Sequence, residues 1–106
     1  MKDGFIKISC ATPTLKVANC RYNADRMIDL IREAHSKGVK IVCFPELSVT
    51  GYTCGDLFLQ DALLESAKSE LCRMIDETAE LDIVSIIGVP LVVKGKLYNC
   101  GVVIII

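Results

Sequence analysis

The chain has 106 residues, with 12 basic and 13 acidic side chains and a formal net charge of −1. With 52% hydrophobic and 24% charged residues, it is too apolar for intrinsic disorder and long enough to bury one core. The mixed charges leave no basic stripe for nucleic acid, and the longest apolar run, residues 102–106, is far below the ~20 residues of a membrane-spanning helix. We therefore expect one domain at most, with neither nucleic acid nor a membrane as partner.

The first half of the chain predicts a strand, a helix and a second strand. Apolar residues alternate over residues 4–11, which is typical of a strand. From about Asn19 they recur at helical spacing, which predicts a helix over residues 21–37 with Asn19 or Asn23 as its N-cap. The short run at residues 39–44 is rich in Val and Ile, as interior strands are.

The second half continues the alternation. Residues 45–60 predict an irregular loop with one short helical turn at 56–60, followed by an amphipathic helix over residues 61–81. Residues 83–89 predict a third strand, and residues 91–93 lead through a tight turn at Gly95 into a last strand. This order predicts an α/β core with parallel strands early, an antiparallel pair late, and both helices on one face of the sheet.

The last strand, residues 97–106, ends in five β-branched residues and is expected to be buried on both faces. Such a strand is an aggregation hazard unless other strands cover it. We therefore expect the chain to be the first part of a longer protein, with its sheet completed by residues that lie outside the chain.

The six cysteines show neither a Cys-x-x-Cys pair nor a histidine at metal-ligand spacing. We expect no metal site and mostly reduced, buried thiols, because four of them lie in apolar segments: Cys10, Cys43, Cys72 and Cys100. The start of the chain lacks the apolar core of a secretory signal, so we expect a cytoplasmic protein.

Glu46 is the one candidate acid or base that the pattern of elements provides. It follows the strand at residues 39–44, and functional groups of α/β proteins collect at the carboxyl ends of strands. Pro45 ends the strand and fixes the backbone before Glu46. We expect the apolar rim to desolvate the carboxylate partly and to raise its pKa, as suits a proton shuttle. A helix-capping or solvated loop carboxylate is the open alternative.

Residues 44–52, Phe-Pro-Glu-Leu-Ser-Val-Thr-Gly-Tyr, resemble the first catalytic motif of the nitrilase, or carbon-nitrogen hydrolase, superfamily. The continuation through residues 53–60 is similar to the amino-terminal glutaminase domains of the glutamine-dependent NAD synthetase family. Further matches are residues 16–20, 88–91 and 97–99. The resemblance implies a nitrilase-like layered α-β-β-α sandwich, of which residues 1–106 are the amino-terminal part.

The same resemblance implies a Glu-Lys-Cys triad that hydrolyses the amide of glutamine. In that triad a Cys attacks the amide, a Glu relays protons and a Lys stabilises the oxyanion. Only the Glu has a counterpart here, Glu46, because the Lys and the Cys would follow residue 106. By resemblance Tyr52 lies close to the glutamine, with a loop anchor as the open alternative. We expect the isolated chain to be inactive.

In such a protein the ammonia would serve ATP-dependent NAD synthesis from the deamidated dinucleotide. The resemblance places ATP and magnesium in a synthetase domain outside this chain, and we expect no cofactor in the chain itself. The expected partners are glutamine, the remainder of the polypeptide and further copies in a homo-oligomer. Two alternatives stay open: a fragment of a stand-alone nitrilase-type amidase, and a non-catalytic module that packs against a partner.

Overall fold

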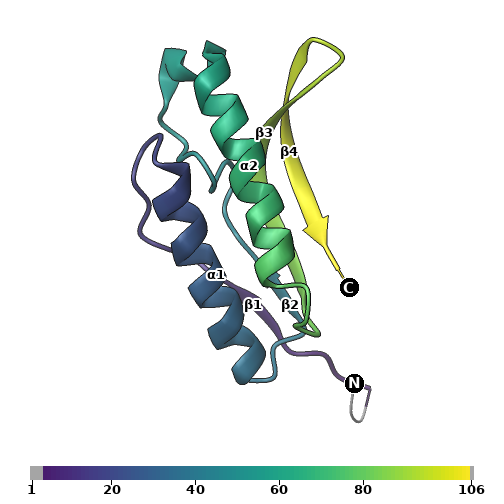
Figure 1. The fold of residues 1–106 in the computed structure, drawn as a ribbon. Coiled ribbons are helices and arrows are strands. Elements are labelled where there is room, and N and C mark those ends of the chain that lie inside the picture. Colours follow the sequence, from purple (N-terminus) through teal and green to yellow (C-terminus); the bar gives the residue numbers. More distant parts are fainter. Residues whose placement is uncertain (1–3, 106) are drawn as a thin grey trace.

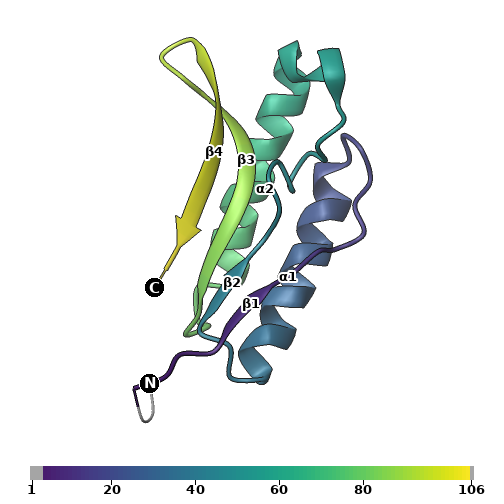
Figure 2. The ribbon, with the colours of Figure 1, turned by 180° about the vertical axis from the view of Figure 1, so that it is seen from behind.

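A computed structural model describes residues 4–105 as a four-stranded sheet with two long helices on one face (Figures 1 and 2). The two figures show the molecule from opposite sides, and in both of them the two long helices cover the same face of the sheet. The elements in chain order are β1 (Ile8–Cys10), α1 (Cys20–Ser36), β2 (Ile41–Cys43), the 3-10 helix η1 (Gly55–Leu59), α2 (Asp61–Glu77), β3 (Val84–Val93) and β4 (Lys96–Ile104).

The sheet order is β1-β2-β3-β4. The first three strands are parallel and β4 is antiparallel to β3. Helix α1 connects β1 to β2, and helix α2 connects β2 to β3. Both connections move across the sheet in the same direction, from β1 toward β3. Connections between parallel strands are right-handed, so both helices lie on the same face of the sheet. The predicted element order, strand directions and helix placement are confirmed.

The element boundaries differ from the predicted ones in instructive ways. Asn19, not Asn23, is the N-cap of α1, since its side chain accepts a hydrogen bond from the Tyr22 backbone N–H at 3.0 Å. Helix α2 ends at Glu77, four residues early, where the Thr78 hydroxyl donates to the Met74 carbonyl at 2.7 Å. β1 is only 3 residues long, and residue 106 of the predicted last strand lies outside the described residues.

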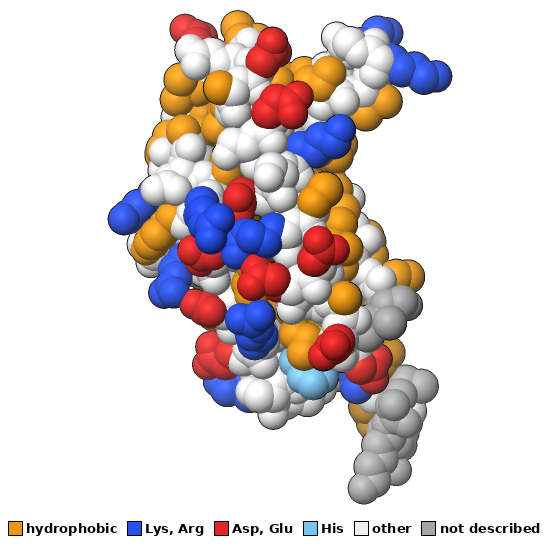
Figure 3. All heavy atoms as spheres, viewed as in Figure 1, with side chains coloured by type: hydrophobic (Ala, Val, Ile, Leu, Met, Phe, Trp, Pro, Cys, Tyr) orange, Lys and Arg blue, Asp and Glu red, His pale blue; other side chains and the backbone are white. Residues whose placement is uncertain are grey.

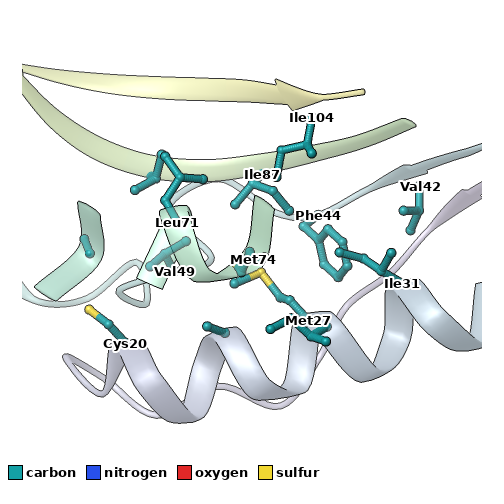
Figure 4. Packing of buried hydrophobic residues seen from close by; sticks show 14 of the residues in the cluster. Cys20, Met27, Ile31, Val42, Phe44, Val49, Leu71, Met74, Ile87 and Ile104 are labelled. Carbon is teal, nitrogen blue, oxygen red and sulfur yellow. The ribbon is translucent and has the colours of Figure 1, made fainter. Parts of the chain in front are cut away.

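The core lies between the helices and the sheet. Figure 4 shows side chains of α1 and α2 pointing toward those of β2, β3 and β4. All of these side chains are buried: Met27 and Ile31 of α1, Met74 of α2, and Val42, Ile87 and Ile104 of the strands. Buried apolar stripes of this kind are the main source of helix stability in a domain.

The outer surfaces of the helices carry mixed charges (Figure 3). Arg73 of α2 lies where the two helices meet and donates hydrogen bonds to Glu70, to Glu77 and to Asp25 of α1. Burial alone would lower the pKa of Arg73, but the hydrogen bonds to Glu70, Asp25 and Glu77 outweigh it and raise that pKa. The guanidinium therefore stays charged, and its contact with Asp25 links α2 to α1.

The sheet face away from the helices is open and apolar. Ile8 is 63% exposed on β1, Val103 is 57% exposed on β4, and Ile105 just after β4 is 65% exposed. The expectation that the last strand is buried on both faces is wrong for the described residues, because no second layer covers this side. We call this surface the open face.

The prediction that most of the cysteines are buried is wrong. All six are free thiols, but only Cys20 and Cys54 are buried. Cys10 is exposed because it lies on the open face, in register with half-buried Cys43. Cys72 is exposed on α2, and Cys100 of β4 is half-buried. An apolar segment thus does not bury a thiol when the element has one uncovered side.

Candidate active site

Glu46 lies in a sharp turn at the carboxyl end of β2. The ladder to β3 continues to Phe44, whose N–H donates to the Ile86 carbonyl at 3.0 Å, and Pro45 then interrupts it. Leu47 follows with a φ of 53°, a left-handed conformation that costs energy in a residue other than glycine. The Gly51 N–H donates to the Leu47 carbonyl at 2.8 Å and closes the turn. The predicted placement of Glu46 at the mouth of the sheet is confirmed.

A shallow pocket of about 270 Å³ lies beside Glu46. Small-molecule sites commonly enclose roughly 300–1,000 Å³, so this pocket is slightly smaller than a typical site. Its lining comes from three segments, namely residues 44–46, residues 86–88 of β3 and residues 99–101 of β4. The segments that bring Glu46 to the pocket are therefore adjacent in the sheet but distant in sequence.

The Glu46 side chain itself is exposed. Within residues 4–105 it takes part in no hydrogen bond or ion pair, and no helix begins at it. The expected partial desolvation by the apolar rim is wrong for this chain taken by itself, because the pocket is open on one side. Helix capping is thus excluded for Glu46, whereas a solvated loop carboxylate and a carboxylate that acts on a substrate both fit its exposed position.

The turn that carries Glu46 is held rigidly from behind. Ser48, Val49 and Thr50 have no exposed surface. Asn23 of α1, also fully buried, donates from its side-chain amide to the Val49 carbonyl at 2.9 Å and to the Lys16 carbonyl at 2.9 Å. Its side-chain oxygen accepts the Lys16 N–H at 2.7 Å. One amide thus joins three segments of the chain.

The sequence predicts Asn23 only as a possible helix cap, not as a residue that tethers the Glu46 turn. The signal that distinguishes it is its place in the buried stripe of α1, next to Ala24 and one turn before Met27. A polar residue in such a stripe must find hydrogen-bond partners. Its partners are in loops, which no helical periodicity reveals.

Tyr52 follows the Glu46 turn and is exposed to solvent. Its side chain is 65% exposed, and it is not part of the pocket lining. The preceding Gly51 has a φ of 86° and lies against the loop at Val17. The role of Tyr52 near a substrate stays a prediction.

Neither a metal site nor a membrane-spanning helix is part of the described structure. Among residues 4–105, no group of three or more His, Cys, Asp or Glu side chains is placed to hold a metal ion. Within the same range, no helix combines the length and apolar character that crossing a bilayer demands.

Residues 7–105 match the model of one family, Carbon-nitrogen hydrolase, and the chain belongs to this family. Among curated relatives, it is similar to the glutamine-dependent NAD(+) synthetase of Mycobacterium tuberculosis, with 34% identity over 101 residues, 95% of this chain and 15% of that protein. The protein of the same name from Dictyostelium discoideum is 38% identical over 78% of this chain and 12% of its own length. The chain thus spans about 15% or less of these two relatives.

Solved structures confirm the nitrilase-like α/β fold. A glutamine-dependent NAD(+) synthetase from Cytophaga hutchinsonii aligns with a TM-score of 0.87 and 33% identity, over 94% of this chain and 17% of that one. An amidase from Nesterenkonia sp. aligns with a TM-score of 0.67 and 20% identity, over 85% of this chain and 34% of its own, which is a likeness of fold alone.

Proposed function

We propose that this chain is the amino-terminal part of the glutaminase domain of a glutamine-dependent NAD synthetase, and that Glu46 is its general base. The observation that carries the proposal is Glu46 itself, exposed in a rigid turn at the carboxyl end of β2 and beside a pocket. Membership of the carbon-nitrogen hydrolase family supplies the reaction class. The relatives, which bear the name glutamine-dependent NAD(+) synthetase, supply the substrate.

The proposed chemistry is hydrolysis of the glutamine amide through a thioester. Glu46 accepts the proton of a cysteine thiol as the sulfur attacks the amide carbon, and returns it to the departing nitrogen so that ammonia leaves. A water molecule, deprotonated in turn by Glu46, then cleaves the thioester to glutamate. The cysteine, and the lysine that stabilises the oxyanion, come from residues outside this chain in the proposal.

The ammonia is consumed, in this proposal, by a synthetase domain that binds ATP and magnesium and that lies outside the 106 residues. The open face supports the idea that further residues of the same polypeptide cover this sheet, because an exposed apolar surface that includes Ile8, Val103 and Ile105 is typical of an interface. A cytoplasmic location and a homo-oligomeric state belong to the same proposal.

The test uses the full-length polypeptide that contains this chain. With the deamidated dinucleotide, ATP and magnesium, it is expected to form NAD from either glutamine or ammonium, and to release glutamate with the former. Release of ammonia from amides without NAD formation would instead establish the stand-alone amidase. Absence of both reactions would favour the non-catalytic module.

A further inference from the structure

Gly88 of β3 leaves the space in which the backbone of the Glu46 turn lies. A Cβ atom at residue 88 would come within 2.4 Å of the Leu47 nitrogen and of the Pro45 carbonyl oxygen, and within 2.9 Å of the Glu46 carbonyl carbon. All three are backbone atoms, so no change of side-chain rotamer relieves the overlap. Any side chain at residue 88 must displace the peptide that carries Glu46.

The requirement is for space and is specific to Gly88. Its φ lies outside the left-handed region, so the backbone conformation itself suits any residue. Gly101 of β4 is its partner across the antiparallel ladder, and a Cβ atom there would meet nothing within 4 Å. Glycine at residue 88 is therefore explained by the close approach of the Glu46 turn.

Ser48 ties the same turn to Gly88. Its buried hydroxyl accepts a hydrogen bond from the Gly88 N–H at 3.3 Å and lies 3.4 Å from the Gly88 carbonyl oxygen, to which it donates. The Val49 N–H donates to that carbonyl as well, at 3.1 Å. These bonds resume the contact between the chain and β3 that Pro45 interrupts.

We propose that Gly88 and Ser48 are positioning residues for the general base. Gly88 allows the backbone at Glu46 to lie close to β3, and the hydrogen bonds of Ser48 hold it at that distance. The inference rests on the proposed function, because it assigns the placement of a proton-transferring carboxylate. Proton transfer and nucleophilic attack demand placement within a fraction of an ångström, and a displacement of about 1 Å lowers the rate by up to about 100-fold.

The first test is Gly88→Ala in the full-length polypeptide. The kcat for glutamine-dependent NAD formation is expected to fall about 10- to 100-fold, while ammonia-dependent formation stays within about twofold. Val89→Ala is the matched control: Val89 is the next residue of β3, fully buried on the helix side. It is expected to lower the melting temperature while leaving the ratio of the two rates unchanged.

A double-mutant cycle separates positioning from general damage. In the Glu46→Gln background, Gly88→Ala is expected to lower the glutamine-dependent rate by less than about twofold, because the group being positioned no longer transfers protons. An equal loss in both backgrounds would contradict the inference.

If Gly88→Ala does not fold, Ser48→Ala tests the positioning inference in its place. Loss of this hydroxyl is expected to lower the glutamine-dependent kcat about 3- to 10-fold, the equivalent of one hydrogen bond, with the ammonia-dependent rate unchanged. If the wild type and Glu46→Gln behave as proposed but the position-88 or position-48 variant keeps the wild-type rate, the positioning inference alone is overturned. A wild type without glutamine-dependent activity overturns the proposed function and this inference together.

Discussion

Single side chains hold the Glu46 turn in place, and Asn23 is the one that also ties it to the start of α1. Its buried amide satisfies both backbone groups of Lys16 and the carbonyl of Val49. Water has no access to this amide, so each lost partner leaves a buried polar group without a hydrogen bond. Asn23 thus couples the start of α1 to the candidate active site.

Replacing Asn23 with Ala is expected to lower the free energy of local opening around residues 46–51 by about 1–3 kcal/mol. Hydrogen exchange of the Val49 and Ala18 amides in the full-length polypeptide measures this, since both amides belong to the tethered loops. Asn19→Ala, which removes the N-cap of the same helix, is the control. An Asn23 variant whose exchange at these two amides matches that of the control would contradict the account.

The candidate site shows what sequence does and does not reveal about residues. Glu46 was predictable because a short apolar strand, a proline and a carboxylate follow one another in the chain. Gly88 and Ser48 are 40 residues apart, and only the fold brings them together. The solvent exposure of Glu46 could not be predicted from the sequence either, because it depends on which layers cover the sheet.

Among the elements, the β3–β4 hairpin carries a residue that is poorly suited to its conformation. Its two-residue turn has φ values of 51° at Lys94 and 77° at Gly95, which is the type I′ pattern that favours Asn-Gly. Lysine has no special tolerance for the left-handed region, whereas asparagine has.

Lys94→Asn is therefore expected to stabilise the hairpin by about 0.5–1 kcal/mol. Slower hydrogen exchange of the paired amides of β3 and β4 in the full-length polypeptide would show it. Lys96→Asn removes the same charge two residues away in β4, where no left-handed residue is needed, and is expected to give no gain. Equal effects of the two substitutions would mean that charge, not turn geometry, is responsible.

Helical periodicity, alternation and short apolar runs predict the order and type of the elements, but not their ends. The last turn of the predicted 61–81 helix is absent because the Thr78 side chain bonds back to Met74 and the backbone turns toward β3. The pattern at residues 83–89 understated β3, which runs on through Val93 because it pairs with β4 along its whole length. Such limits arise from side-chain hydrogen bonds and strand pairing, neither of which has a sequence period.

The uncovered side of the sheet is the main feature of the described structure. The helix-covered side is buried, whereas Ile8, Val103 and Ile105 of the other side are exposed. The five β-branched residues at the end of the last strand predict burial on both sides, but they do not show which chain segment covers them. In the layered sandwich that the family resemblance implies, a second layer would cover this side.

The 106-residue polypeptide alone is therefore expected to self-associate through this surface and to release no ammonia from glutamine. Light scattering and an ammonia assay test the two statements separately. A monomeric, cooperatively folding polypeptide would remove the physical basis for a missing layer. Measurable glutaminase activity would contradict the proposal that a cysteine and a lysine from outside the chain are required.

Glu46→Gln in the full-length polypeptide, assayed with both nitrogen sources, tests whether Glu46 is the general base of a glutaminase. The substitution keeps the side-chain volume but removes the proton shuttle, so glutamine-dependent NAD formation is expected to fall about 10²- to 10⁴-fold while ammonia-dependent formation stays nearly intact. Glu80→Gln, an exposed glutamate beyond α2, is expected to change neither rate. Equal loss with both nitrogen sources would make Glu46 a structural residue, and unchanged glutamine-dependent activity would contradict its assignment as the base.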